Sequence, residues 1–153
     1  MVDNKNKANK AFTVLVVEDN QIFRELLCEV ITVLQPHWRI YEATNGQEGL
    51  ELAQCIRPDL IFLDFHMPVM NGYQMVLALQ QHPETAQIPL ILSTSEDYRH
   101  PQIIHLRTLC QAALFKPFSL EELERVLEQV SSVHAFWDLK FRGMSEVAQL
   151  EFA

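Results

Sequence analysis

The chain has 153 residues, 48% of them hydrophobic, and this size and composition predict one compact domain with a core of its own. Its formal net charge is -8 at pH 7, and most of its few lysines lie in the first ten residues, so the basic surface typical of nucleic-acid-binding proteins is missing. The longest apolar run is much shorter than a bilayer span and the polar start MVDNKNKANK has no signal-peptide core, so we expect a cytoplasmic protein without a membrane segment.

Strand-like and helix-like segments alternate from residue 12 onward. The first, FTVLVVE (12–18), is β-branched and apolar on both faces, which predicts a buried parallel strand. A helix is expected over 20–34 with Asn20 as its N-cap, and Ser119 and Glu122 predict a capping box at the start of the last helix. The other expected strands cover 38–43, 59–64, 88–94 and 112–116, and the other expected helices cover 46–55, 72–81, 102–110 and 119–130. This alternation predicts an α/β fold, a doubly wound five-stranded parallel sheet with helices on both faces.

The flanking segments differ in character from this core. Residues 1–11 are expected to form a disordered polar tail, 12–131 the folded domain, and 132–153 a helical extension with apolar residues such as Trp137 and Phe141 at helical spacing. One interpretation is that the extension packs on its own domain. The other is an exposed apolar stripe for a partner or for a homodimer formed through 132–153.

The three cysteines lie in apolar patterns without CxxC or any other metal-ligand spacing. Cys28, Cys55 and Cys110 are therefore expected to be reduced and mostly buried. We predict neither a disulfide nor a zinc site.

Chemically active residues follow the predicted strands at their carboxyl ends, where ligands bind to open parallel sheets. The first strand ends in Glu18 and Asp19, the third in Asp64, the fourth in Thr94 and the fifth in Lys116. If the first and third strands are neighbours, three carboxylates meet, and a raised pKa or a bound cation must relieve their repulsion. Magnesium fits, because it prefers carboxylate oxygens, water and phosphate.

This arrangement predicts phosphoryl chemistry. A carboxylate oxygen of Asp64 would attack phosphorus while Lys116 and the cation neutralise the phosphoryl oxygens and Thr94 donates a hydrogen bond. The alternative is purely structural, with Glu18 and Asp19 capping a helix and Asp64 ending a strand at the surface.

Four segments carry a family resemblance. VLVVEDN, LIFLDFHMPVMNG, LILSTS and FKPF resemble, in order and spacing, the signature segments of bacterial two-component response regulator receiver domains. The resemblance covers roughly residues 12–130 and is greatest to single-domain, chemotaxis-regulator-like receivers. It implies a flavodoxin-like sheet of order 2-1-3-4-5.

The resemblance also implies individual roles. Asp64 would be the phosphoacceptor. The implied magnesium ligands are Glu18, Asp19, Asp64 and the backbone carbonyl of His66. The implied phosphoryl-binding and supporting residues are Thr94, Lys116, Ser95 and Pro117, with the bond between Lys116 and Pro117 in cis.

The function implied is a phosphorylation-dependent signalling switch that takes its phosphoryl group from a histidine kinase and signals by protein–protein contact, without conventional enzyme activity. A phosphorelay intermediate that serves a phosphotransfer protein is a close alternative. A pseudo-receiver that binds a partner without phosphorylation is a second. A phosphohydrolase like the haloacid dehalogenases is a third, although those enzymes place an aspartate where this chain has His66.

Two positions depart from, or extend, the family pattern. Ala113 stands three residues before Lys116, where family members usually carry the Tyr or Phe that reports phosphorylation. His66 is either an exposed loop histidine or a group that modifies the attacking water and so the lifetime of the phosphoryl group.

Overall fold

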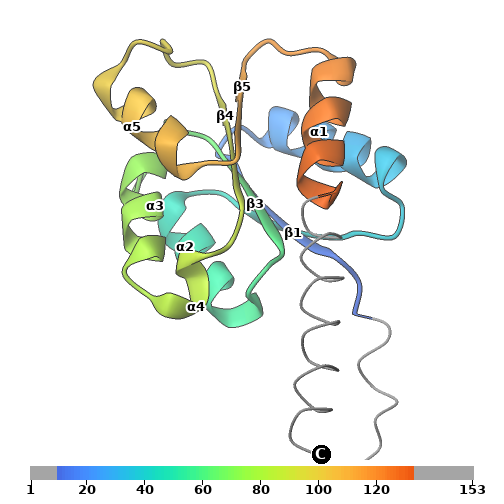
Figure 1. Cartoon of the computed structure of the whole chain (residues 1–153), viewed down its shortest axis with the longest axis horizontal. Helices are drawn as coiled ribbons and strands as arrows, with labels where there is room; N and C mark the ends of the chain where they lie inside the picture. Colours follow the sequence, from blue (N-terminus) through green and yellow to red (C-terminus); the bar gives the residue numbers. More distant parts are fainter. Residues whose placement is uncertain (1–9, 133–153) are drawn as a thin grey trace, which may run out of the picture. The chain divides into compact units, whose positions relative to one another are not determined.

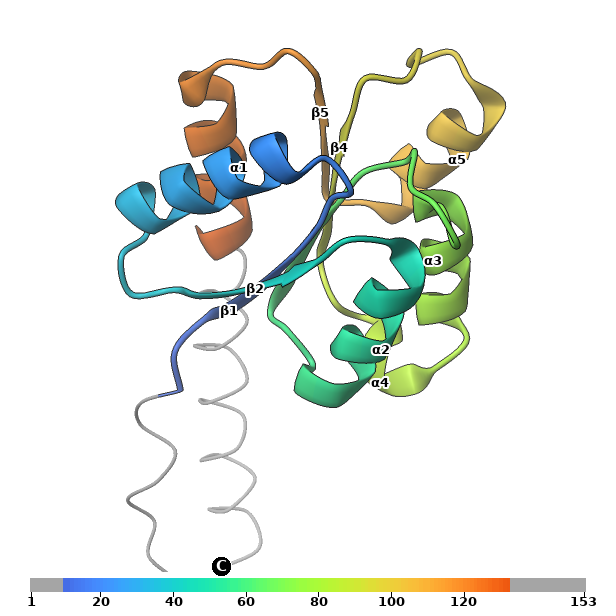
Figure 2. The same ribbon diagram turned by 180° about the vertical axis from the view of Figure 1, so that it is seen from behind.

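The computed structural model describes residues 10–132, so the predictions for the first residues of the tail and for 133–153 lie outside the described residues. The chain divides into two compact units, one ending at Pro117 and the other starting at Phe118. The first unit contains a five-stranded parallel sheet of order β2-β1-β3-β4-β5 (Figures 1 and 2), which confirms the predicted strand order.

The strands form where apolar, β-branched segments predict them. Their bounds are β1 Thr13–Val17, β2 Arg39–Ala43, β3 Leu60–Leu63, β4 Leu90–Thr94 and β5 Ala112–Phe115. Every residue of β1, β3 and β4 is buried, as expected of inner strands that are covered on both faces.

Helices cover both faces of this sheet (Figures 1 and 2). Helix α1, Gln21–Leu34, lies on one face, and Asn20 caps it as predicted by accepting a hydrogen bond from the Phe23 N–H at 2.9 Å. The helices on the other face are α2 Gly46–Ile56, α3 Gly72–Gln80 and α5 Pro101–Leu109. A short helix, α4 at Pro83–Ala86, was not predicted.

The hydrophobic core cluster packs between the sheet and the α2, α3 and α5 layer. Alternate strand residues such as Leu15, Ile61 and Leu92 contribute to it and are fully buried. On the opposite strand face the buried residues include Val16 and Phe62. This packing fixes the strands from both sides and so holds the positions of their carboxyl ends.

The second unit begins with a capped helix. Residues 120–132 are helical. The Ser119 N–H donates to the Glu122 carboxylate at 2.7 Å and the Glu122 N–H donates to the Ser119 hydroxyl at 3.1 Å, which confirms the predicted capping box.

Two further expectations concern burial and membranes. The three cysteines are free, as predicted, but the expectation that most are buried was wrong: Cys28 and Cys110 are half-buried and Cys55 is exposed. Cys28 lies in α1, Cys55 lies in α2, and Cys110 is the residue that caps the C-terminus of α5. Among residues 10–132, the helices are all too short or too polar to span a bilayer.

Candidate functional site

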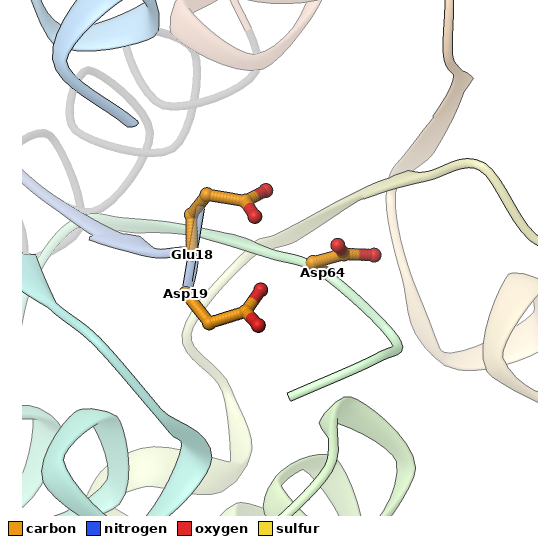
Figure 3. A group of neighbouring side chains, drawn as sticks. All are labelled: Glu18, Asp19 and Asp64. Atoms are coloured by element: carbon orange, nitrogen blue, oxygen red, sulfur yellow. The ribbon is translucent and has the colours of Figure 1, made fainter. Parts of the chain in front are cut away.

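The ends of β1 and β3 lie side by side and bring three acids together (Figure 3). The strands are in register up to Val17 and Leu63, and the Asp64 N–H donates to the Val17 carbonyl at 3.1 Å. As a result, one carboxylate oxygen each from Glu18, Asp19 and Asp64 lies within 4.8 Å of the others. The condition set by the sequence, that the first and third strands are neighbours, is met.

Burial makes this cluster electrostatically costly. Glu18 is 3% exposed and Asp64 is 7% exposed, whereas Asp19 is exposed. Burial is the main cause that raises the pKa of Glu18; hydrogen bonds from Lys116 and from the Asn20 N–H oppose the rise, and the charge of Asp64 adds to it. The site therefore favours a positive group between its carboxylates.

Lys116 supplies one such group from the end of β5. Its Nζ donates to Glu18 Oε2 at 2.7 Å and to Asp64 Oδ2 at 3.3 Å. The same nitrogen lies 3.9 Å from the centre of the Phe23 ring, which adds a cation–π contact. The bond from Lys116 to Pro117 is cis, as the resemblance implied.

Thr94 ends β4 beside Lys116. It is fully buried, its carbonyl accepts a hydrogen bond from the Lys116 N–H at 2.8 Å, and its hydroxyl accepts one from the Glu96 N–H at 3.2 Å. The neighbouring Ser95 side chain is exposed. Thr94 is thus anchored to the strand that carries the lysine.

Two glycines let the loop after Asp64 fold tightly. The Gly72 N–H donates to the Phe65 carbonyl at 2.9 Å, and a Cβ at Gly72 would lie 2.2 Å from the Asp64 carbonyl oxygen. The Gly46 N–H donates to the Met70 carbonyl at 3.0 Å, and a Cβ there would lie 2.2 Å from that oxygen. Side chains at either glycine would push the loop, and Asp64 with it, out of place.

The structure adds contacts that the sequence did not predict. His66 Nε2 forms a hydrogen bond with the Glu96 carboxylate and joins the loop after β3 to the loop after β4. The pKa of Glu96 is lowered, mainly by the hydrogen bond from the Asp97 N–H and to a smaller extent by the hydrogen bond with His66. Arg24 of α1 donates to the Glu18 backbone carbonyl at 2.8 Å. No sequence pattern signals either contact, because each joins residues through folded geometry alone.

The cluster fits a hard divalent cation. Its carboxylates come from rigid strand ends, two of them are buried, and oxygen donors at this spacing suit Mg²⁺. Glu18, Asp19 and Asp64 would hold such an ion.

Comparison with known proteins places these features in one family. Residues 14–128 match the response regulator receiver domain family. Protein PilH of Pseudomonas aeruginosa is 29% identical over 76% of this chain and 95% of its own length. A protein-glutamate methylesterase/protein-glutamine glutaminase of Hahella chejuensis is 32% identical over 72% of this chain, but the match spans only 28% of that relative's length.

Solved structures agree. The chemotaxis protein CheY4 of Vibrio cholerae has a TM-score of 0.70 and 27% identity, and the match covers 79% of this chain and 99% of CheY4. The receiver domain of the sensor histidine kinase PA1611 of P. aeruginosa has the same fold with a TM-score of 0.70 and 24% identity over 78% of this chain and 97% of that domain, and it holds magnesium in its active-site cleft. The chain belongs to the response regulator receiver domain family.

Proposed function

We propose that Asp64 is the phosphoacceptor of a signalling switch in a two-component system, with a histidine kinase as the phosphoryl source. The observation that carries this proposal is the convergence of Asp64 with two further acids and Lys116 at one sheet edge. The receiver domain proposed here spans 12–131. Its family membership supports a histidine kinase partner, because several relatives are histidine kinases or response regulators.

The chemistry follows from the positions of the groups. A carboxylate oxygen of Asp64 forms a bond to phosphorus, and the bond from phosphorus to the donor's imidazole nitrogen breaks. The electron pair goes to that nitrogen, and because the other ring nitrogen of the phosphohistidine donor carries a proton, the kinase histidine leaves as neutral imidazole. The product is an acyl phosphate on Asp64.

The surrounding residues stabilise the charge that develops. Lys116, now 3.3 Å from Asp64 Oδ2, would move onto a phosphoryl oxygen, and the Thr94 hydroxyl would donate to another. Glu18, Asp19, Asp64 and the His66 backbone carbonyl are the proposed ligands of magnesium, which would supply positive charge to the phosphoryl oxygens. Pro117 and Ser95 are the proposed supporting residues.

The proposed output is protein–protein contact with a downstream target, in the cytoplasm and without conventional enzyme activity or nucleic-acid binding. A phosphorelay role differs from this proposal only in the next step, in which Asp64 would pass its phosphoryl group to another protein. It would be recognised by transfer of the phosphoryl group from this chain to a histidine phosphotransfer protein. Homodimer formation through 132–153 is a separate proposal, tested by comparing the sedimentation of the full chain with that of a chain ending at residue 131.

The pseudo-receiver alternative is favoured by one observation, the absence of the usual aromatic at Ala113. The intact acid cluster and the placement of Lys116 oppose it, because a binding module without phosphorylation needs neither.

Intact mass after incubation with acetyl phosphate and MgCl₂ tests the proposal. We expect one added phosphoryl mass on the wild type, and none without Mg²⁺ or in Asp64→Asn. Asp97→Asn, which removes an exposed acid of the next loop, is the matched control and should still take up the group. An unmodified wild type that also fails to bind beryllofluoride would favour the pseudo-receiver.

A further inference from the structure

Arg24 of α1 forms a hydrogen bond with the backbone of the turn that carries Glu18 and Asp19. Glu18 N–H donates to the Ala43 carbonyl at 3.0 Å, which is the last backbone bond between β1 and β2. The strands beside it end at Ala43 and Leu63, so the Glu18 carbonyl lies beyond the ladder. Arg24 Nη1 donates to this carbonyl at 2.8 Å.

The same guanidinium is anchored at its other edge. Arg24 Nε donates to Glu42 Oε1 of β2 at 3.1 Å, and the Arg24 side chain is only 13% exposed. The Arg24 N–H also donates to the Asn20 carbonyl at 2.9 Å in the first turn of α1. Arg24 therefore connects the end of β1 and the strand β2 through its guanidinium, and it bonds the first turn of α1 through its backbone N–H.

The opposite side of Glu18 faces the site. Its carboxylate accepts from Lys116 Nζ at 2.7 Å and from the Asn20 N–H at 3.1 Å. Arg24 thus bonds the backbone of the residue whose side chain belongs to the acid cluster. A shift of that backbone would move the Glu18 carboxylate and, through the next peptide bond, Asp19.

We infer that Arg24 is a positioning residue for the cation site: its guanidinium, braced by Glu42, fixes the Glu18 backbone so that the carboxylates of Glu18 and Asp19 are preorganised to bind Mg²⁺. This inference rests on the proposed function. It assigns to Arg24 no contact with the ion or the phosphoryl group. Partners that orient metal ligands typically change metal affinity strongly when they are removed.

The fork geometry is the important property, rather than the charge. Arginine presents donors on two edges of one plane, whereas lysine carries a single ammonium and cannot reach two acceptors in this way. Arg24→Lys therefore keeps the positive charge but loses the bridge between Glu18 and Glu42. Arg24→Met loses both.

The test is to titrate each variant with Mg²⁺ and to monitor binding through the amide chemical shifts in NMR spectra. We expect Arg24→Lys and Arg24→Met each to raise the Mg²⁺ dissociation constant about tenfold, and Glu42→Gln to raise it about threefold. Arg39→Lys changes an exposed arginine at the start of β2 and should bind Mg²⁺ like the wild type.

A second readout separates positioning from general damage. The rate of phosphoryl uptake from acetyl phosphate is measured at rising MgCl₂ for the same variants. At saturating Mg²⁺ the Arg24 variants should return to within about twofold of the wild-type rate, because a lost ground-state contact is compensated by ligand concentration. A folding defect would not be rescued in this way.

Three results would overturn the inference. The first is wild-type Mg²⁺ affinity in all three variants, Arg24→Lys, Arg24→Met and Glu42→Gln. The second is loss of affinity in Arg24→Met but not in Arg24→Lys, which would show that a single ammonium donor is enough and that the two-edged guanidinium is not needed. The third, a wild type that binds no Mg²⁺, would overturn the proposed function and this inference together.

If the Arg24 variants misfold, the Mg²⁺ affinity of Glu42→Gln alone decides between these outcomes, since Glu42 is half-exposed.

Discussion

At the ends of β1 and β3, three carboxylates lie within ligand range of one another and two of them bond to the Lys116 ammonium, whereas on β5 the residue three before that lysine is Ala113. The first region holds the acids and the lysine that we propose for phosphoryl transfer. The second lacks the ring by which relatives of this family usually report the transfer.

The β4–β5 region has aromatic side chains at other positions. The Tyr98 ring, in the loop after β4, packs edge-on against Phe115 with centroids 6.4 Å apart. The Arg107 guanidinium of α5 lies 5.8 Å from the centre of the Phe115 ring. Because Phe115 pairs with Thr94 across the sheet, these contacts lie next to the proposed phosphoryl-binding residue Thr94. We therefore expect phosphoryl uptake and its readout to depend on different residues.

The largest effect is expected at the acid cluster, from Lys116→Met. Without the ammonium, Glu18 and Asp64 lose the hydrogen bonds that Lys116 donates, and phosphoryl uptake should fall about a hundredfold, as when one donor to a developing charge is removed. Uptake is followed by intact mass over time. Lys10→Met, an exposed lysine outside the site, is the control, and an equal rate in both variants would contradict the role of Lys116.

Gly72→Ala should destabilise the same region. The new Cβ would lie 2.2 Å from the Asp64 carbonyl oxygen, and we expect the free energy of unfolding to drop by about 3 kcal/mol, as for severe overpacking. Urea denaturation measures this. In Gly49→Ala the new Cβ would meet side-chain atoms of Val17 and Met75, so its effect should be smaller. Equal effects would show that the loop is not rigid.

At the readout region, Tyr98→Ala should leave phosphorylation almost unchanged. Tyr98 is 59% exposed and bonds to none of the three acids, so the uptake rate is expected to change less than about threefold. A loss as large as that of Lys116→Met would mean that the two regions are not separable.

The smallest effect is expected for Ser93→Ala. The Ser93 hydroxyl is buried without a hydrogen-bond partner among the described residues, so its removal should raise the free energy of unfolding by about 1 kcal/mol. Thr85→Val is the contrast, because the Thr85 hydroxyl donates to the Leu79 carbonyl at 2.7 Å and its loss should destabilise. Urea midpoints that shift in the same direction for both would contradict this account.

The fold could be predicted from the sequence because its buried strands are continuous apolar runs with polar residues at their ends. Asp64 follows such a run, and parallel pairing then forces it beside Glu18. Helix α4 was missed because four residues carry no periodicity. The Cys55 exposure was misjudged because its helix face depends on packing, which local apolarity does not specify.

The site was predictable in its members but not in its supports. Polar residues at the ends of apolar strands can be identified from the sequence, whereas the contact of His66 with Glu96 joins loops thirty positions apart in sequence. The hydrogen bond from Arg24 to the Glu18 backbone carbonyl likewise cannot be predicted from residue types, because any residue supplies a backbone carbonyl. Both require the folded geometry.

The most direct measurement of the central claim is the identity of the phosphorylated residue. After phosphorylation with acetyl phosphate and Mg²⁺, borohydride reduces an acyl phosphate of aspartate to homoserine, and peptide mass mapping locates the change. The account predicts homoserine at position 64 and nowhere else. Homoserine at position 19, or a phosphoryl group that borohydride leaves intact on another side chain, would contradict it.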